Sequence, residues 1–179
     1  MTKAAAALLC LLGWPAWAQV QAPKPDAWAP MRFMVGDWQG TASGEPGTGT
    51  VVRHYEFILG GQFVHERNTS TFPPQDKNKA GEVHEHWSLF SHDKKRKTIL
   101  FRQFHQESFV VTYALNPALS TPSRLVFDSE QVENIPSSWK ARETYDLISA
   151  DEFTETFELS QAGKPFAVYS RNHFKRRQP

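Results

Sequence analysis

Two histidines in the middle of the sequence have the spacing of metal ligands on a β-strand. His84 and His86 lie two residues apart in the segment V-H-E-H-W. Alternate residues of a strand point to the same face, and imidazole is a common ligand of transition metals, so both side chains could reach one ion. A third ligand could come from His105 or from His65 on neighbouring strands. This pattern makes a metal-dependent enzyme one candidate function.

The same segment supports a second interpretation, in which the two histidines face solvent. Val83, Trp87 and Leu89 share the other phase of the strand and form its more apolar set, although a glutamate lies among them. The apolar phase of a half-buried strand normally faces the core. On this interpretation Trp87 points inward and the histidines form a surface pair.

The strand around Arg102 has polar groups in both phases. Arg102 and Phe104 share one phase, whereas Phe101 and His105 share the other. Either choice therefore places a polar side chain inside, where an unpaired polar group is costly. We expect Arg102 to hold the polar group of a ligand, with Glu85 as an internal partner for whichever polar group points inward. Without a bulge, only one of Phe101 and Arg102 can face the interior.

Short runs of alternating apolar and polar residues, separated by turn signals, continue from Gly36 to the C-terminus. This pattern predicts strands. They are expected at residues 38–43, 49–59, 62–72, 82–92, 98–106, 109–115, 124–130, 142–148, 153–159 and 166–174. Gly60-Gly61 is predicted to form a two-residue hairpin turn. The helical candidate is Asp26–Val35, with Asp26 as its N-cap.

Consecutive hairpins without a long crossover favour an all-β, about ten-stranded antiparallel up-and-down barrel, because closure removes the unpaired strand edges. Such a barrel commonly encloses a pocket, so we expect a small apolar or amphipathic molecule to bind in its lumen, and a binding protein rather than an enzyme. The predicted lining residues are Trp38, Tyr55, Phe57, Trp87, Phe101, Arg102, Tyr113, Tyr145 and Phe157. Aromatic side chains can also fill a small lumen, so a filled barrel is the alternative.

The N-terminus has the pattern of a secretory signal peptide. Lys3 precedes the short apolar run Ala4–Gly13, and Ala16-Trp17-Ala18 matches a cleavage site. The predicted organisation is a signal peptide at 1–18, an extended arm at 19–30 and one barrel domain at 31–179. We therefore expect export to the periplasm or the extracellular space, with no membrane span after cleavage. Cys10 is the chain's one cysteine, so the mature chain would hold no disulfide.

The charge of the chain is balanced, with a formal net charge of +1. The basic runs 94–97 and 175–177 are short and are expected to be a hairpin tip and a solvated tail. This charge balance argues against a nucleic-acid partner. Nucleophilic catalysis also has little support, because the predicted mature chain lacks cysteine and no G-x-S-x-G motif is present. Glu143 and Glu155 are expected to stabilise the outer surface of the sheet.

The segment F-M-V-G-D-W-Q-G at 33–40 resembles the opening strand of the calycin superfamily, which includes lipocalins and fatty-acid-binding proteins. Together with L-G-G-Q-F at 59–63, it also resembles a group of bacterial domains of unknown function with this barrel. Ten strands after a short helix are more similar to the fatty-acid-binding and nitrobindin-like members than to eight-stranded lipocalins. The resemblance extends over roughly residues 34–177.

The resemblance implies two possibilities for the last strand. Nitrobindin-like domains bind haem through a histidine on this strand, which makes His173 a candidate axial ligand and haem a possible cofactor. Fatty-acid-binding proteins hold a ligand carboxylate with an Arg-x-Tyr pair, which Tyr169 and Arg171 resemble in reverse order. Against the haem interpretation, the apolar residues of this segment, such as Phe174, lie in the phase opposite to His173.

Overall fold

The computed structural model describes residues 26–135, 138–161 and 163–178. The predicted signal peptide and residues 19–25 of the predicted arm lie outside these residues. Ten strands occur in the described part of the chain: β1 (Gly36–Gly44), β2 (Gly47–Ile58), β3 (Phe63–Phe72), β4 (Glu82–Asp93), β5 (Thr98–His105), β6 (Val110–Leu115), β7 (Arg124–Glu133), β8 (Trp139–Ser149), β9 (Glu152–Gln161) and β10 (Ala167–Arg176).

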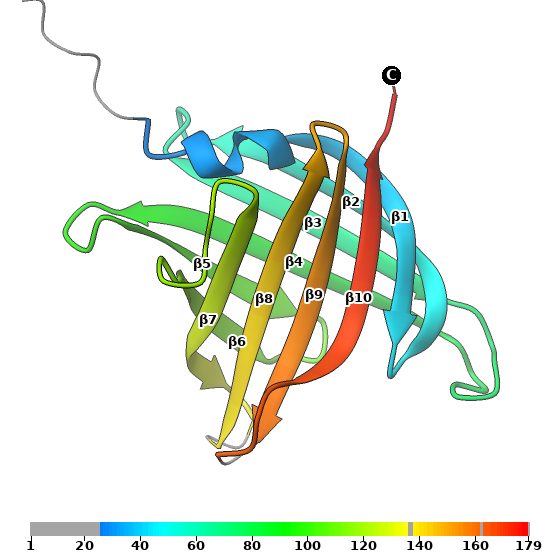
Figure 1. The fold of residues 1–179 in the computed structure, drawn as a ribbon. Coiled ribbons are helices and arrows are strands. Elements are labelled where there is room, and N and C mark those ends of the chain that lie inside the picture. Colours follow the sequence, from blue (N-terminus) through cyan, green and yellow to red (C-terminus); the bar gives the residue numbers. More distant parts are fainter. Residues whose placement is uncertain (1–25, 136–137, 162, 179) are drawn as a thin grey trace, which may run out of the picture.

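The strands form one closed barrel in which each pairs antiparallel with its neighbours in the chain (Figure 1). The closure is made by β1 and β10, which pair over the register Trp38↔Arg176 to Gly44↔Ser170. The predicted up-and-down barrel is therefore confirmed.

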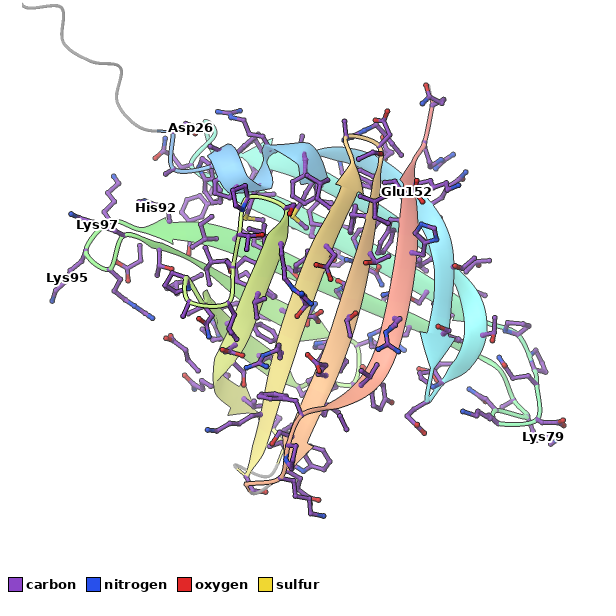
Figure 2. The ribbon with its side chains drawn as sticks, viewed as in Figure 1. Asp26, Lys79, His92, Lys95, Lys97 and Glu152 are labelled. Atoms are coloured by element: carbon purple, nitrogen blue, oxygen red, sulfur yellow. The ribbon has the colours of Figure 1, made fainter. Side chains whose placement is uncertain are left out.

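The predicted strand positions also agree closely with the structure, but one turn differs. The β2–β3 connection is a four-residue loop, Leu59–Gln62, instead of a two-residue turn. Leu59, Gly60 and Gly61 all have positive φ, and the Gly61 N–H donates to the carbonyl of Ile58 at 3.1 Å. The two glycines supply the left-handed backbone that the loop needs, as expected, but two more residues join it. The basic run 94–97 forms the β4–β5 turn, at whose tip Lys95 and Lys97 project into solvent (Figure 2).

The predicted helix is a short 3₁₀-helix, η1 (Ala29–Met34), which lies across one end of the barrel (Figure 1). Its N-cap is Trp28 rather than Asp26, and the Asp26 carboxylate accepts from the Trp28 N–H at 3.0 Å. Met31 and Met34 of this helix are fully buried against the barrel. The indole Nε1 of Trp38 donates to the carbonyl of Met34 at 2.6 Å, which ties η1 to the barrel.

The half of the barrel next to η1 is filled by buried aromatic side chains. They are Trp38, Tyr55, Phe90, Phe101, Tyr113, Phe127, Tyr145, Phe153 and Phe174. Phe101 stacks on Tyr113 at a ring-centroid distance of 4.4 Å, and Phe153 stacks on Phe174 at 4.7 Å. Burial of each such ring contributes about 1.5–3 kcal/mol. The alternative of a filled lumen is thus correct for this half of the molecule.

Candidate functional site

The other half of the barrel contains a cavity of about 560 Å³. Its lining residues lie toward the ends of the strands that are remote from η1. Part of the wall is apolar and comprises Phe109, Val111, Val132, Phe157 and Leu159; polar side chains form the rest, among them Asn68, His86, Gln103, Glu143, Glu155 and Asn172. The barrel therefore has a solid half and a hollow half, and the hollow half is amphipathic.

A buried ion network separates the aromatic core from the cavity. Arg53 donates from Nη1 and Nη2 to the two carboxylate oxygens of Glu155, at 2.6 and 2.9 Å. Its Nε lies 2.8 Å from Asn68 Oδ1 and 3.0 Å from Glu66 Oε1. The guanidinium also stacks over the ring of Phe174, 4.5 Å from its centroid. One buried cation is thus held between two carboxylates, with a polar face toward the cavity and an aromatic face toward the core.

The surroundings of the buried carboxyl groups drive their protonation in opposite directions. Burial acts to raise the pKa of Glu66, but Arg53 and then His86 outweigh it and lower the pKa to about 2. Glu143 lies on β8 across from β9, and its pKa is raised well above the usual value by burial and by the nearby charge of Glu155. Glu66 is therefore a carboxylate at neutral pH, whereas the surroundings of Glu143 favour its protonated form, which can donate a hydrogen bond.

Several buried polar atoms around this network have no hydrogen-bond partner within the described residues. They include Tyr113 OH, Tyr145 OH, Glu143 Oε2 and His86 Nδ1. Buried polar groups in native proteins are nearly always paired with protein, water or ligand atoms. The inside of the barrel therefore carries polar atoms whose hydrogen-bonding capacity is not used by the described residues.

Three histidines come together on the wall of the cavity. His84 and His86 on β4 and His105 on β5 all point inward, and His86 lies directly opposite His105 in the strand register. Their ring centroids are 5.3–5.6 Å apart. Burial, with the neighbouring His86 and His84, lowers the pKa of His105 to about 2, so its ring is neutral. His105, rather than His65, is the third member, since His65 faces outward beside Trp87.

Among the predicted lining residues, Phe157 lines the cavity. Trp38, Tyr55, Phe101, Tyr113 and Tyr145 also point inward, but they lie in the aromatic core beneath it. Phe57 is half-buried at the opposite end, where its ring packs edge-on against Trp28 at 6.0 Å.

The structure places Trp87 and Arg102 on the outer face, so their expected interior positions are wrong. Trp87 is 56% exposed, and Arg102 pairs with Glu133 at 2.7 Å. The reason lies in the neighbouring aromatic residues. Phe90 stacks on Phe101 inside the barrel at 4.6 Å, and this contact fixes the inward phase of both strands. The polar phase of β4 thus faces the lumen, and Trp87 lies in an outer surface depression with Leu89 and Phe104.

His173, the candidate haem ligand on β10, also lies on the outer face of the barrel. His173 is exposed, and its Nε2 lies 2.6 Å from Glu152 Oε1, while Phe174 occupies the inward phase. His173 therefore cannot reach a haem inside the barrel. Glu143 and Glu155 depart from expectation in the other direction, since both are buried and border the cavity instead of the outer surface.

The sequence interpretation missed Arg53, Glu66 and Asn68, which form the polar floor of the cavity together with Gln103, a residue of the polar cluster recognised around Arg102. In strand β3 the inward phase reads Val64, Glu66, Asn68 and onward to Phe72. These residues could have been found from the sequence of β3, which has polar residues in both phases. In a closed barrel, such a strand must place polar side chains inside. Tyr169 lies at the rim and lines the cavity, whereas Arg171 belongs to an outer groove.

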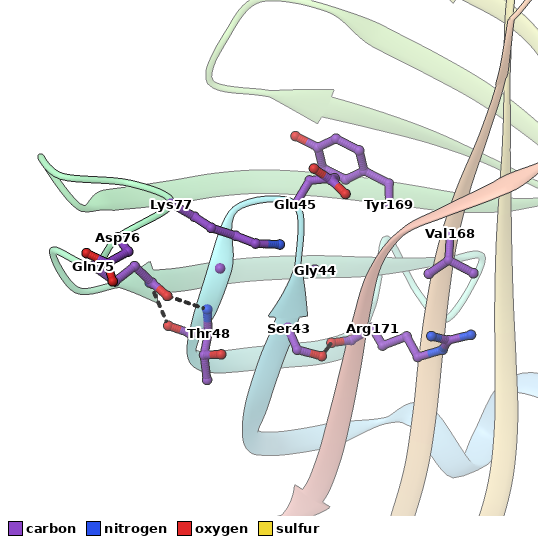
Figure 3. Close-up of a pocket in the computed structure, with 11 residues that line it drawn as sticks. Ser43, Gly44, Glu45, Thr48, Gln75, Asp76, Lys77, Val168, Tyr169 and Arg171 are labelled. Carbon is purple, nitrogen blue, oxygen red and sulfur yellow. Dashed lines mark hydrogen bonds between the residues drawn. The ribbon is translucent and has the colours of Figure 1, made fainter.

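That outer groove, of about 580 Å³, lies beside the cavity mouth between the β1–β2 turn and the β3–β4 loop (Figure 3). Gln75 holds the two segments together: its Oε1 accepts from the Thr48 N–H at 2.9 Å, and its Nε2 donates to the Thr48 carbonyl at 3.0 Å. Lys77 and Glu45 line the groove with exposed side chains. The groove and the cavity share the lining residue Tyr169.

Among the residues that the structure describes, no helix is both long and apolar enough to cross a bilayer. The chain matches no protein-family model and no curated protein sequence. In fold it is similar to the solved structure of Rv2717c from M. tuberculosis, with a TM-score of 0.59 and 11% sequence identity. The match covers 88% of this chain and 99% of the other. At this identity the likeness shows the fold alone, a closed antiparallel barrel.

Proposed function

We propose that this protein binds a small, mostly apolar molecule with a neutral polar group in the hollow half of its barrel. The observation that carries the proposal is the amphipathic cavity of about 560 Å³ inside a closed barrel. Its volume is in the range of small-molecule sites, which combine apolar walls with a few placed polar groups.

The apolar part of the wall supports the binding of an apolar body. Phe109, Val111, Val132, Phe157 and Leu159 come from different strands and from the β5–β6 turn. Removing apolar surface from water contributes about 25 cal/mol per Å². Phe109 also stacks on the ring of His105 at 4.0 Å, which holds both rings against the cavity.

The charges around the cavity favour a neutral polar group over a carboxylate. The buried cation Arg53 is already paired with Glu66 and Glu155. Glu82 and Glu107 line the cavity as well, and Lys140 is exposed at its rim. An alcohol, amide or ester oxygen could accept from the protonated Glu143, whereas a second carboxylate would meet like charges. Arg102, expected to hold the polar group of the ligand, lies on the outer face. In the proposal, the buried polar side chains around Arg53 and Glu143 take this role.

A titration with the neutral apolar dye Nile red tests this proposal. We expect saturable fluorescence enhancement with wild-type protein and a loss of at least about tenfold in affinity for Ala141→Phe, because Ala141 is buried in the cavity wall. The matched control is Ala114→Phe, since Ala114 alternates with the buried Tyr113 and points outward on β6. Equal affinity of Ala141→Phe and wild-type protein would contradict binding in the cavity. Native mass spectrometry of the purified wild-type protein can then reveal a co-purified guest.

The proposal includes export of the chain to the periplasm or the extracellular space. The support is the order of a positive residue, a short apolar run and an A-x-A site in residues 1–18. An exported barrel with a hollow end would meet small amphipathic molecules outside the cytoplasm.

A further inference from the structure

The histidine cluster on the cavity wall has the arrangement of a metal site. We propose that His84, His86 and His105 together bind one divalent first-row transition-metal ion, Zn²⁺ being the best fit, with the fourth coordination position open to the cavity. This inference does not depend on the proposed binding of an apolar molecule.

The first support is the convergence of the three rings. One ring nitrogen of each histidine lies within 4.8 Å of one from each of the others. His84 Nε2 and His105 Nδ1 are 3.4 Å apart. Two ligands of a tetrahedral zinc ion, each about 2.0–2.1 Å from the metal, are separated by about 3.3–3.4 Å. This pair therefore already has the required spacing, and a ring nitrogen of His86 lies within 4.8 Å of one from each of the other two.

The second support is the hydrogen bonding on the far side of each ring. His84 Nδ1 lies 2.9 Å from Glu107 Oε1, His86 Nε2 lies 3.0 Å from Glu66 Oε1, and His105 Nε2 lies 3.0 Å from Gln103 Oε1. Carboxylate and amide oxygens accept, so in each case the ring nitrogen donates. A neutral imidazole that donates from one nitrogen carries a lone pair on the other.

When all three rings are neutral, as metal binding requires, the remaining nitrogens are His84 Nε2, His86 Nδ1 and His105 Nδ1, each with a lone pair. His86 Nδ1 is buried without a partner within the described residues. With both rings neutral and donating on their far sides, the lone pairs of His84 and His105 face each other at 3.4 Å, and a cation between them would remove their repulsion. Metal-bound histidines characteristically donate their other N–H to a carboxylate or carbonyl oxygen. The three acceptors here have this role.

The third support is access and charge. The three histidines line the cavity, so an ion can enter and still offer a position to water or to a ligand oxygen. Two carboxylates, Glu66 and Glu107, lie directly behind the rings. Three neutral nitrogen ligands with an open position are the arrangement of a Lewis-acid site rather than a closed structural one. Such an ion would polarise a carbonyl or a water molecule that reaches the cavity.

The test is a metal titration of tag-free protein that has been stripped with a chelator. We expect one Co²⁺ per chain with the visible absorption of four-coordinate cobalt, displaced by one Zn²⁺. His84→Ala and His105→Ala should each weaken Zn²⁺ binding by at least about 100-fold, and Glu107→Gln by about tenfold, because it loses only the carboxylate that orients His84. The matched control, His173→Ala, should bind like wild-type protein, since His173 is exposed on β10.

Two results of the titration would overturn the proposal. One is the absence of saturable Co²⁺ and Zn²⁺ binding by the wild-type chain. The other is a site lost in His84→Ala and retained in His105→Ala, which would place the ion on Glu82, His84 and Glu107, the alternative group in this region. Imidazole ¹H–¹⁵N spectra of the wild-type protein need no substitution. Zn²⁺ should shift the signals of His84, His86 and His105 and leave that of His173 in place, and unchanged signals would also refute the site.

Discussion

At the scale of single residues, the interior is dominated by charges that are held in place by one another. Arg53 is completely buried and contacts two carboxylates, while Glu143 forms no ion pair within the described residues and its pKa is raised well above the usual value by burial and by Glu155. Buried ions without partners cost several kcal/mol each. The polar floor of the cavity therefore depends on a small number of side chains, and its substitutions should be far more severe than those of surface ion pairs.

Arg53→Met should lower the free energy of unfolding by about 3–5 kcal/mol, because it leaves Glu66 and Glu155 buried without their cation. Urea denaturation measures this loss. The matched control is Arg102→Met, which removes an exposed ion pair with Glu133 and should cost less than about 1 kcal/mol. Similar losses in the two variants would refute the central role of Arg53.

Glu143 should make the protein less stable as pH rises. Its pKa is raised in the folded state, so the folded chain keeps a proton that the unfolded chain releases above about pH 4.5. The stability contributed by the protonated group is therefore fully present below pH 4.5 and is lost progressively above it. Glu143→Gln cannot ionise, so its stability relative to wild-type protein should increase from pH 4 to pH 7.5 in urea denaturation.

The control for this measurement is Glu130→Gln. Arg96 lowers the pKa of Glu130, so the wild-type pair stabilises the fold above pH 4.5 and weakens as pH falls. The sign of the pH dependence should thus be opposite, and its size small because the pair is exposed. A stability difference between Glu143→Gln and wild-type protein that does not change with pH would show that Glu143 is ionised when folded.

At the scale of elements, the seam between β1 and β10 explains part of the G-D-W-Q-G motif. A Cβ atom added to Gly40 would lie 1.9 Å from the carbonyl oxygen of His173 on β10. The two backbones approach so closely here that a side chain has no room. Trp38, two residues earlier, points inward and bonds to η1. The motif therefore serves closure of the barrel, with no ligand contact required to explain it.

Gly40→Ala should destabilise the protein by about 3 kcal/mol, the upper end for overpacking, because backbone rather than a flexible side chain must move. Thermal or urea unfolding measures the effect. In the variant, amide hydrogen exchange along β1 and β10 should be faster than in wild-type protein, and the increase should be larger there than in the other strands. Thr41→Ala, an outward change on the same strand, is the control and should be close to neutral. Uniformly unchanged exchange along the seam would contradict this account.

At the scale of the whole molecule, one half of the barrel is a packed core and the other half contains the candidate site. The half under η1 is packed with aromatic rings, and the other half is hollow with an amphipathic wall. A rigid filled half can hold the polar floor in place while the open half exchanges its contents. The proposed ligand and the proposed metal share this hollow half, and His105 contacts both the apolar wall and the histidine cluster.

The proposed export predicts the cell fraction and the N-terminal residue of the mature chain. When the full chain is expressed in a Gram-negative host, we expect it in the periplasmic fraction with an intact mass that begins at Gln19. Ala18→Arg should block cleavage at the predicted site and leave a longer chain in the membrane or cell fraction. A wild-type chain that keeps Met1–Ala18 and stays in the cytoplasm would disprove the export proposal.

The number and order of the strands follow from the sequence alone, because period-two alternation and turn residues are local signals that need no knowledge of distant contacts. The sequence also determined closure, since a meander of this length is left with unpaired edges otherwise. It placed His84 and His86 on one face and named His105 as a possible third partner. These conclusions depend on residues that are close along the chain or on the general requirement to pair every strand.

Side-chain packing inside the barrel determines which face of β4 and β5 points inward. Both phases of these strands mix polar and apolar residues, so hydrophobicity alone could not choose, and the packing of Phe90 against Phe101 made the choice. That contact sent Trp87 and Arg102 outward and brought the three histidines together through the His86↔His105 register. The extent of the cavity was likewise decided by how many aromatic rings fit together across the barrel, because packing depends on the joint shape of side chains from many strands.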